Sequence, residues 1–189
     1  MCKLLLLGGL EFSVGVPAQL GGAIINNLGA YDQEISTYIQ HITILKNNHI
    51  IYLTKDECDF NYHLSNLQHS NNIILASSFN LPTQDKDIIQ TKMIHNFKSR
   101  SNSQPLNFPN AGSVFKRSGN IVPPQLIDNA GLKGLCVNNA EVSTKHAGFI
   151  INKGHATCKD VLALIEIIKH KIFEKYGVQL TLEIEYVSF

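Results

Sequence analysis

The sequence lacks any pair of cysteines spaced as C-x-x-C, and its four cysteines stand far apart at Cys2, Cys58, Cys136 and Cys158. Neither a zinc knuckle nor a dithiol redox site is therefore expected. A disulfide framework is also unexpected, because such frameworks belong to small, cysteine-dense secreted domains. We expect these thiols to be buried or chemically idle in a reducing cytosol.

Long apolar runs and an excess of one charge are also missing. No run reaches the ~18 apolar residues of a membrane-spanning helix. The first apolar run, residues 4–7, is shorter than the ~7–15 residues of a signal-peptide core, and no A-x-A cleavage site follows it. The formal net charge is only +1, whereas a nucleic-acid binder has a strongly basic face. We therefore expect a cytoplasmic globular protein with no nucleic-acid or membrane partner.

What the sequence does contain is apolar residues in short periodic segments. Hydrophobic residues make up 44% of the 189 positions, enough to bury a core. Strand-like runs come first, then a helix, a polar loop, a second helical part and a last strand, an order that favours an α+β fold over a doubly wound parallel sheet. These segments are strands at 39–45, 49–53, 71–78 and 178–186, and helices at 83–99, 124–129 and from Thr157 to a stop at Gly177. The loop at 99–107 predicts two domains, 1–100 and 101–189.

Residues 15–31 form a glycine-dense segment that reads GVPAQLGGAIINNLGAY. Backbone N–H groups in such a segment can approach a phosphate or a flavin closely. The spacing is neither G-x-G-x-x-G nor that of a Walker loop. A purely structural set of turns is the alternative, and without further context it is the commoner one.

A second candidate lies at residues 110–117, which read NAGSVFKR. Ser113 could offer a hydroxyl as proton donor while Lys116 and Arg117 bind an anionic substrate. The alternative is an ordinary turn with solvated basic side chains. Near the end of the chain, alternation places Glu183 on the polar face of the predicted last strand, and periodicity leaves open whether this face meets a cleft or water.

Two histidines, His146 and His155, flank an apolar run at 148–152. Neither has a second ligand at metal spacing, so structural or surface roles are expected and no metal site is predicted.

Taken in order, these segments resemble the family of UDP-N-acetylenolpyruvoylglucosamine reductases, flavoenzymes that complete UDP-N-acetylmuramate for bacterial peptidoglycan. The first half carries GVPAQLGGA and NLGAY, similar to the family's GIPGTVGGA…NAGAYG, and then FNYHLS, similar to F-x-Y-R-x-S. The second half carries QP, NAGSVFK, AGLKG, VS, KHAGFIIN and GVQLTLEI, similar to QP…SAGSFFK and, at the end, to GVxLEPEV. The absence of a tyrosine-loop insertion is similar to type II members.

The resemblance implies that NADPH reduces FAD, and that the reduced flavin passes a hydride to the enolpyruvyl double bond of a UDP-sugar. It implies Ser113 as proton donor, Glu183 as the carboxylate that stabilises or protonates the intermediate, and Lys116 and Arg117 as substrate-binding residues. Residues 1–100 would be the remainder of a PCMH-type FAD-binding domain, and residues 101–189 an α+β domain that binds the UDP-sugar. The implied flavin-binding residues are Gly15, Pro17, Gly21, Gly22, Asn27 and Gly29.

Three departures from the family pattern bear on activity. Members of the family begin with a further region that carries a G-x-G-S-N loop for the flavin pyrophosphate, and here the glycine segment begins only 14 residues after Met1. His63 stands where the family has an arginine, and an imidazole is mostly neutral at pH 7 and cannot bind a carboxylate in a fork. Ala18 and Gln19 replace a Gly and a Ser or Thr.

Three functions therefore remain open: a working reductase, a truncated remnant that binds a UDP-sugar or a partner without catalysis, and an unrelated phosphate-binding module. The oligomeric state is left open. We also expect the second half to fold alone, because its capped helix and strand bury a continuous apolar stripe.

Overall fold

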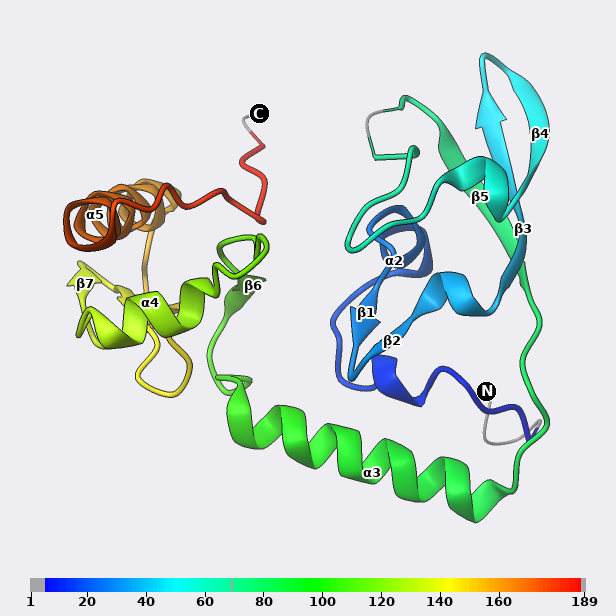
Figure 1. The fold of residues 1–189 in the computed structure, drawn as a ribbon, viewed down its shortest axis with the longest axis horizontal. Helices are drawn as coiled ribbons and strands as arrows, with labels where there is room; N and C mark the ends of the chain where they lie inside the picture. Colours follow the sequence, from blue (N-terminus) through cyan, green and yellow to red (C-terminus); the bar gives the residue numbers. More distant parts are fainter. Residues whose placement is uncertain (1–5, 69, 188–189) are drawn as a thin grey trace. The chain divides into compact units, whose positions relative to one another are not determined.

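The computed structural model describes residues 6–68 and 70–187, and it divides into two compact units, Met1–Arg100 and Ser101–Phe189 (Figure 1). Both units combine helices with antiparallel sheets. The expected α+β class is confirmed. No helix in the described ranges is both long and apolar enough to cross a membrane.

The first unit is built around a three-stranded antiparallel sheet in the order β4-β3-β5. Its core gathers Phe12, Ile24, Ile42, Ile44 and Cys58, all at most 1% exposed. The elements in chain order are η1 (Glu11–Ser13), α2 (Leu20–Ile25), β1 (Gly29–Ala30), β2 (Gln33–Glu34), η2 (Ile35–Thr37), β3 (Ile39–Lys46), β4 (His49–Thr54), η3 (Asp56–Cys58), β5 (Ile73–Phe79) and α3 (Lys86–Ser103).

The β3–β4 hairpin follows its sequence pattern closely. Thr43 pairs with Tyr52 and Lys46 with His49, so that two residues form the turn. These residues, Asn47 and Asn48, have φ values of 50° and 61°. A two-residue turn with positive φ at both positions matches the right-handed twist of the strands, and asparagine tolerates this conformation well.

The glycine segment departs from the predicted series of turns, because its middle forms the short helix α2. Ala23 and Ile24 bury their side chains in the core of the unit. Burial of this apolar face outweighs the ~1 kcal/mol cost of each helical glycine at Gly21 and Gly22.

Helix α3 ends four residues later than the sequence predicted, inside the expected loop. Arg100 explains the extension. Its guanidinium donates to the carbonyls of Val14 and Phe12 and lies 5.8 Å from the centre of the Tyr31 ring. This buried anchor depends on residues more than 60 positions away and has no local sequence signal.

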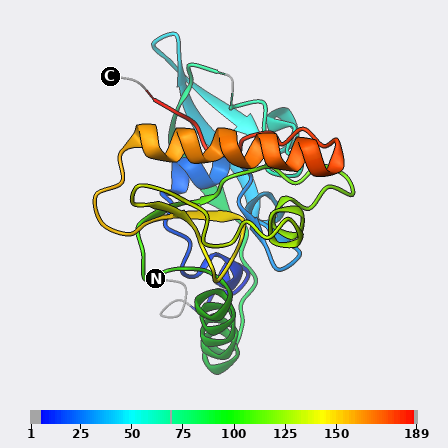
Figure 2. The same cartoon turned by 90° about the vertical axis from the view of Figure 1, so that its left-hand side faces the viewer.

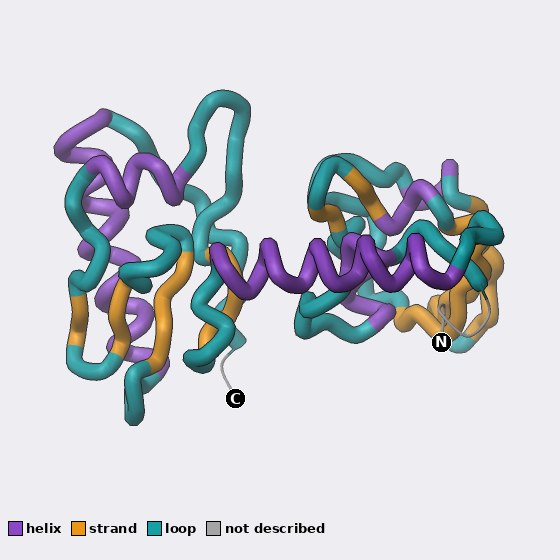
Figure 3. The backbone as a smooth tube through the Cα atoms, turned by 90° about the horizontal axis from the view of Figure 1, so that it is seen from below, coloured by secondary structure: helices purple, strands orange, loops and turns teal. Residues whose placement is uncertain are grey.

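The second unit is a four-stranded antiparallel sheet in the order β6-β9-β8-β7, with α5 along one face beside α4 (Figure 2). Figure 3 shows its strands side by side with helix on one side of the sheet. Its elements are β6 (Asn110–Ser113), α4 (Pro123–Asn129), β7 (Cys136–Val137), β8 (Ala140–Val142), β9 (Phe149–Asn152) and α5 (Cys158–Tyr176).

Helix α5 begins and ends where the sequence predicted. Thr157 and Asp160 form a complete capping box, and Gly177 ends the helix with φ 67°. Leu164, Ile165, Ile168 and Ile172 are at most 1% exposed and form the centre of the core. The 3.6-residue period places these side chains on one stripe facing the sheet.

The predicted last strand, residues 178–186, is only partly correct. The segment makes one antiparallel bridge, Leu182 with Phe115, and is otherwise irregular. Backbone hydrogen bonds join residues 181–183 of this segment to residues 114–116, just beyond β6, and so the pairing is too short to form a regular strand.

Candidate active site

Ser113 ends strand β6 and pairs with Phe149 of β9. Asn110 shapes the approach to it, because its amide donates to the carbonyls of Pro105 and Phe108 and its oxygen accepts from Gly112 N–H. Gly112 has φ +85°, which favours glycine. Ser113 is therefore held exposed at the end of a loop that Asn110 organises.

The predicted serine and glutamate lie on adjacent backbone segments although 70 residues separate them in sequence. Glu183 N–H donates to the Val114 carbonyl at 2.9 Å, and Lys116 N–H donates to the Thr181 carbonyl at 2.8 Å. Ser113 directly precedes Val114. The short antiparallel pairing thus brings the backbones of Ser113, Lys116 and Glu183 into one strip of the second unit.

Lys116 and Arg117 are exposed, whereas Glu183 is half-buried. A hydroxyl, a carboxylate and two cations along one strip can bind an anion and exchange a proton with it.

A cavity of about 420 Å³ also opens in the second unit. Pro105, Leu106, Phe108 and Ile151 supply apolar walls, and Lys145 supplies a cation. The remaining lining residues are Ser101, Asn107, Ser143 and Thr144. The cavity thus combines apolar walls with several polar groups, as small-molecule sites do, and the cation favours an anionic ligand.

Candidate-site reasoning from the sequence missed this cavity. Its residues come from two segments about 40 positions apart, 101–108 and 143–151. The sequence carried one signal for it: three of the family-like motifs, QP, VS and KHAGFIIN, overlap these two segments. The sequence alone assigned no role to these motifs.

The six residues expected to bind a flavin divide into two groups. Pro17 and Gly22 are exposed and Gly21 is half-buried, and a Cβ at either glycine would meet nothing within 4 Å. This backbone is therefore accessible. By contrast, a Cβ at Gly15 would lie 3.1 Å from the Phe97 ring, and one at Gly29 would lie 3.3 Å from the Gln33 carbonyl, so these two glycines also serve internal packing.

Asn27 is fully buried, and its amide is used within the unit. The amide nitrogen donates to Glu34 and to the Asn61 carbonyl, both at 2.9 Å, and its oxygen accepts from Ser36 N–H. Asn27 therefore ties the end of the glycine segment to β2 and to the loop that carries His63.

His63 lies half-buried in that loop with φ 52°, its ring 4.4 Å from the Tyr62 ring. Gln68 donates to the His63 carbonyl, and Ser65 donates to the Ile25 carbonyl at the end of α2. These bonds hold the loop against the glycine segment. The position that holds arginine in the family pattern is thus well fixed, but it carries an imidazole.

The three described cysteines are free thiols, with Cys58 buried and Cys136 and Cys158 exposed. Burial and the neighbouring Glu57 raise the pKa of Cys58. No group of three or more metal-ligating side chains gathers anywhere in residues 6–68 and 70–187.

Comparison with known proteins first identifies a class by fold, that of two-unit α+β proteins. A solved structure with this fold is that of UDP-N-acetylenolpyruvylglucosamine reductase from Thermus caldophilus, with a TM-score of 0.85 and 30% identity. The match covers 97% of this chain and 66% of that one.

Sequence comparison names the family. Residues 104–187 match the model of the UDP-N-acetylenolpyruvoylglucosamine reductase C-terminal domain. A curated reductase of that name from Clostridium novyi is 44% identical over 183 residues, and one from Thermotoga sp. is 43% identical over 180 residues. The chain is therefore similar to this family along most of its length and matches the family's C-terminal domain at residues 104–187, so that the resemblance seen in its motifs is confirmed. It spans about 60% of the length of these curated relatives.

Proposed function

We propose that this chain takes part in reducing the enolpyruvyl group of UDP-N-acetylglucosamine enolpyruvate, a step of peptidoglycan synthesis, with NADPH as reductant and FAD as cofactor. The observation that carries this proposal is the pairing of residues 114–116 with residues 181–183. This pairing holds the backbone next to Ser113 against that of Glu183, which supports a shared site in which a hydroxyl, a carboxylate and cations would act on one substrate. The cytoplasmic location stays a prediction.

The chain's own residues would hold the substrate and move the proton. Lys116 and Arg117 would attract the anionic substrate, and Lys145 would bind its diphosphate where the nucleotide enters the cavity in the second unit. The Ser113 hydroxyl would donate a proton to the substrate carbon. Glu183 would help to stabilise the intermediate or to protonate it.

In the first unit, the accessible backbone of Pro17, Gly21 and Gly22 fits a role in holding the flavin. Gly15, Asn27 and Gly29 would shape this segment. The flavin, when bound, supplies the hydride chemistry. Residues 1–100 are accordingly proposed as flavin-binding and residues 101–189 as substrate-binding.

The test is NADPH oxidation by the full chain with excess FAD, with and without the enolpyruvyl substrate. We expect oxidation that depends on substrate and falls at least ~100-fold in Ser113→Ala, since general acid catalysis contributes ~10²–10⁴. Ser118→Ala, an exposed serine a few residues on, is the matched control. Substrate-dependent oxidation that is equal in the two variants would remove Ser113 from the mechanism.

A second candidate is a binding protein without catalytic activity, which the imidazole of His63 favours. A neutral histidine offers one N–H where an arginine offers a fork of donors with a fixed charge. Under this alternative, the chain binds the UDP-sugar but oxidises no NADPH. If His63→Arg then gains turnover, the residue at this position is what limits catalysis.

A further inference from the structure

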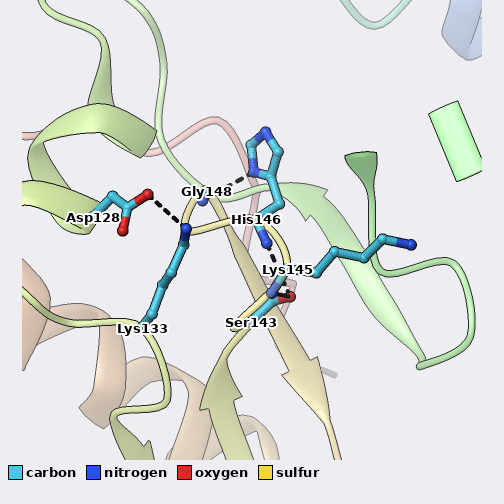
Figure 4. A network of polar contacts seen from close by, with 6 residues as sticks. All are labelled: Asp128, Lys133, Ser143, Lys145, His146 and Gly148. Carbon is cyan, nitrogen blue, oxygen red and sulfur yellow. Dashed lines mark hydrogen bonds and ion pairs between the residues drawn. The ribbon is translucent and has the colours of Figure 1, made fainter. Parts of the chain in front are cut away.

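The turn that carries Lys145 is held by the side chain of its first residue, Ser143. Ser143, directly after β8, is 1% exposed, and its hydroxyl accepts hydrogen bonds from the N–H groups of Lys145 and His146 at 3.2 and 3.3 Å (Figure 4). Ser143 N–H in turn donates to the Phe149 carbonyl at 2.9 Å. The start of the turn is therefore fixed to the strand that follows it.

His146 closes the same turn. Its Nδ1 accepts Gly148 N–H at 3.1 Å, and its ring meets the edge of Phe149 at 4.9 Å between centroids. A Cβ at position 148 would lie 3.0 Å from the imidazole and 2.8 Å from Pro124. The half-buried ring thus occupies space that only a glycine at 148 leaves.

Lys145 leaves this turn on the side of the cavity. Its Nζ donates to the Ser101 carbonyl, and Ser143, Thr144 and Lys145 all line the cavity. Figure 4 shows the Lys145 side chain and the His146 ring pointing away from the turn in different directions. The imidazole and Lys145 thus extend from one turn, whose backbone N–H groups are held by the Ser143 hydroxyl and by His146 Nδ1.

The protonation state of His146 matters because Nδ1 accepts a hydrogen bond only when it is unprotonated. Burial lowers the pKa of His146 below its ordinary value of 6.5; a hydrogen bond to the residue's own backbone opposes this effect in part, and the charge of Lys133 adds to it. Lys133 is paired with Asp128 of α4, and Lys145 is the neighbouring cation in the chain. Above this pKa, the imidazole is neutral and the turn is closed.

We infer that His146 is a positioning residue for the cavity: its neutral imidazole holds Gly148 N–H and so sets the turn that directs Lys145 to an anionic ligand. When His146 is protonated, two donors face each other at Nδ1 and Gly148, and the turn opens. Anion binding then falls as pH drops through the His146 pKa, below 6.5. This inference deepens the proposed function, since it rests on a UDP-sugar as the ligand of the cavity.

The test follows the full chain by ¹⁵N NMR between about pH 7.5 and about pH 5, the range in which a histidine titrates. At the upper end we expect Nδ1 of His146 to be unprotonated, with the proton on Nε2. The amide signals of residues 143–148 should titrate together with the imidazole, at one midpoint.

The same samples are titrated with UDP-N-acetylglucosamine, whose diphosphate is esterified at both ends and keeps its charge over this range. We expect wild-type affinity to fall about tenfold towards pH 5, the size of one charge-assisted hydrogen bond. His146→Asn keeps an acceptor that does not titrate, and should bind with no such pH dependence. His146→Leu should bind weakly throughout. His170→Asn, an exposed histidine on α5, should respond like wild type.

A proton on Nδ1 at neutral pH would overturn the inference. Amide signals of residues 143–148 that do not shift as the imidazole titrates would also overturn it. A wild-type affinity that stays constant while the ring titrates would overturn it as well. If the turn titrates as expected but UDP-N-acetylglucosamine binds at no pH, the positioning role stands and the proposed ligand of the cavity is wrong.

Discussion

At the scale of single residues, buried polar side chains organise the segments proposed to be functional. Asn27 holds the end of the glycine segment, and Ser143 holds the turn beside the cavity. Asn110, although exposed, does the same for the loop before Ser113. Among the described residues, no buried side-chain nitrogen or oxygen lacks a hydrogen-bond partner. A buried polar group left unsatisfied costs ~1–3 kcal/mol, so removing one partner is costly.

Gly148 gives a sharp residue-scale prediction, because its missing Cβ makes room for both Pro124 and His146. We expect Gly148→Ala to lower the free energy of unfolding by ~1–3 kcal/mol, the usual cost of overpacking. Urea unfolding followed by circular dichroism measures the change.

The matched control is Gly154→Ala, where the nearest atom to the added Cβ is 3.8 Å away, on Asn139. Gly154, like Gly148, has a φ outside the left-handed range, so neither substitution strains the backbone. Equal unfolding free energies for the two variants would show that the ring and the proline move aside at no cost.

At the scale of elements, helix α5 depends on a cap formed by three side chains. Thr157 and Asp160 bond reciprocally, and Asn138 donates to the second Asp160 oxygen at 2.7 Å. Because Asn138 follows β7, the cap also joins the start of the helix to the sheet. These bonds lower the pKa of Asp160 below its ordinary value of 3.8, the largest effect coming from Thr157 N–H, followed by the Asn138 amide and the Thr157 hydroxyl.

Removing the hydroxyl of this cap should destabilise the second unit measurably. We expect Thr157→Ala to lower the free energy of unfolding by ~0.5–2 kcal/mol. Thr181→Ala, an exposed threonine outside any helix, should change it by less than ~0.5 kcal/mol. Thermal unfolding at neutral pH tests the pair.

The pH dependence gives a second readout of the same cap. A carboxyl with a lowered pKa in the folded state stabilises at neutral pH, and this contribution is lost as pH falls from 3.8 through the lowered value. Asp160→Asn should lack this part of the acid sensitivity. If the acid unfolding of wild type and variant has the same pH dependence below 3.8, Asp160 does not stabilise the fold through its charge.

At the scale of the whole molecule, the two units differ in how much apolar surface they remove from water. The second unit has a continuous core from β6 to the last segment, including Phe115, Ile127, Leu164 and Leu180. The first unit exposes apolar side chains on the outer face of its sheet; these are Ile50, Tyr52, Ile73 and Leu75, all at least 49% exposed. Burial of apolar surface is the main stabilising contribution, so the first unit should be the weaker one.

Limited proteolysis of the full chain tests this difference. We expect cleavage throughout the first unit while a fragment beginning near residue 101 persists, because opening of a marginal unit exposes its backbone. Mass spectrometry identifies the fragments. A surviving fragment from the first unit, with the second degraded, would reverse the assignment; the capping variant Thr157→Ala should shorten the lifetime of the expected fragment.

The sequence by itself determined the elements whose signals are local. The asparagine pair sets the β3–β4 hairpin, and Thr157, the apolar period and Gly177 set the length of α5, because turn and cap residues act on backbone groups a few positions away. The ordered motifs were likewise sufficient for the family.

Only the tertiary structure decided which distant segments meet. The pairing of 114–116 with 181–183, the Arg100 anchor that lengthens α3, the burial of Asn27 and the cavity walls all join residues far apart in the chain. Such contacts depend on close packing between elements that are distant in the sequence. A short stretch of neighbouring residues therefore does not predict them. The chemistry proposed for Ser113 and Glu183 needs both kinds of information, since the motifs supplied the side chains and packing brought their backbones together.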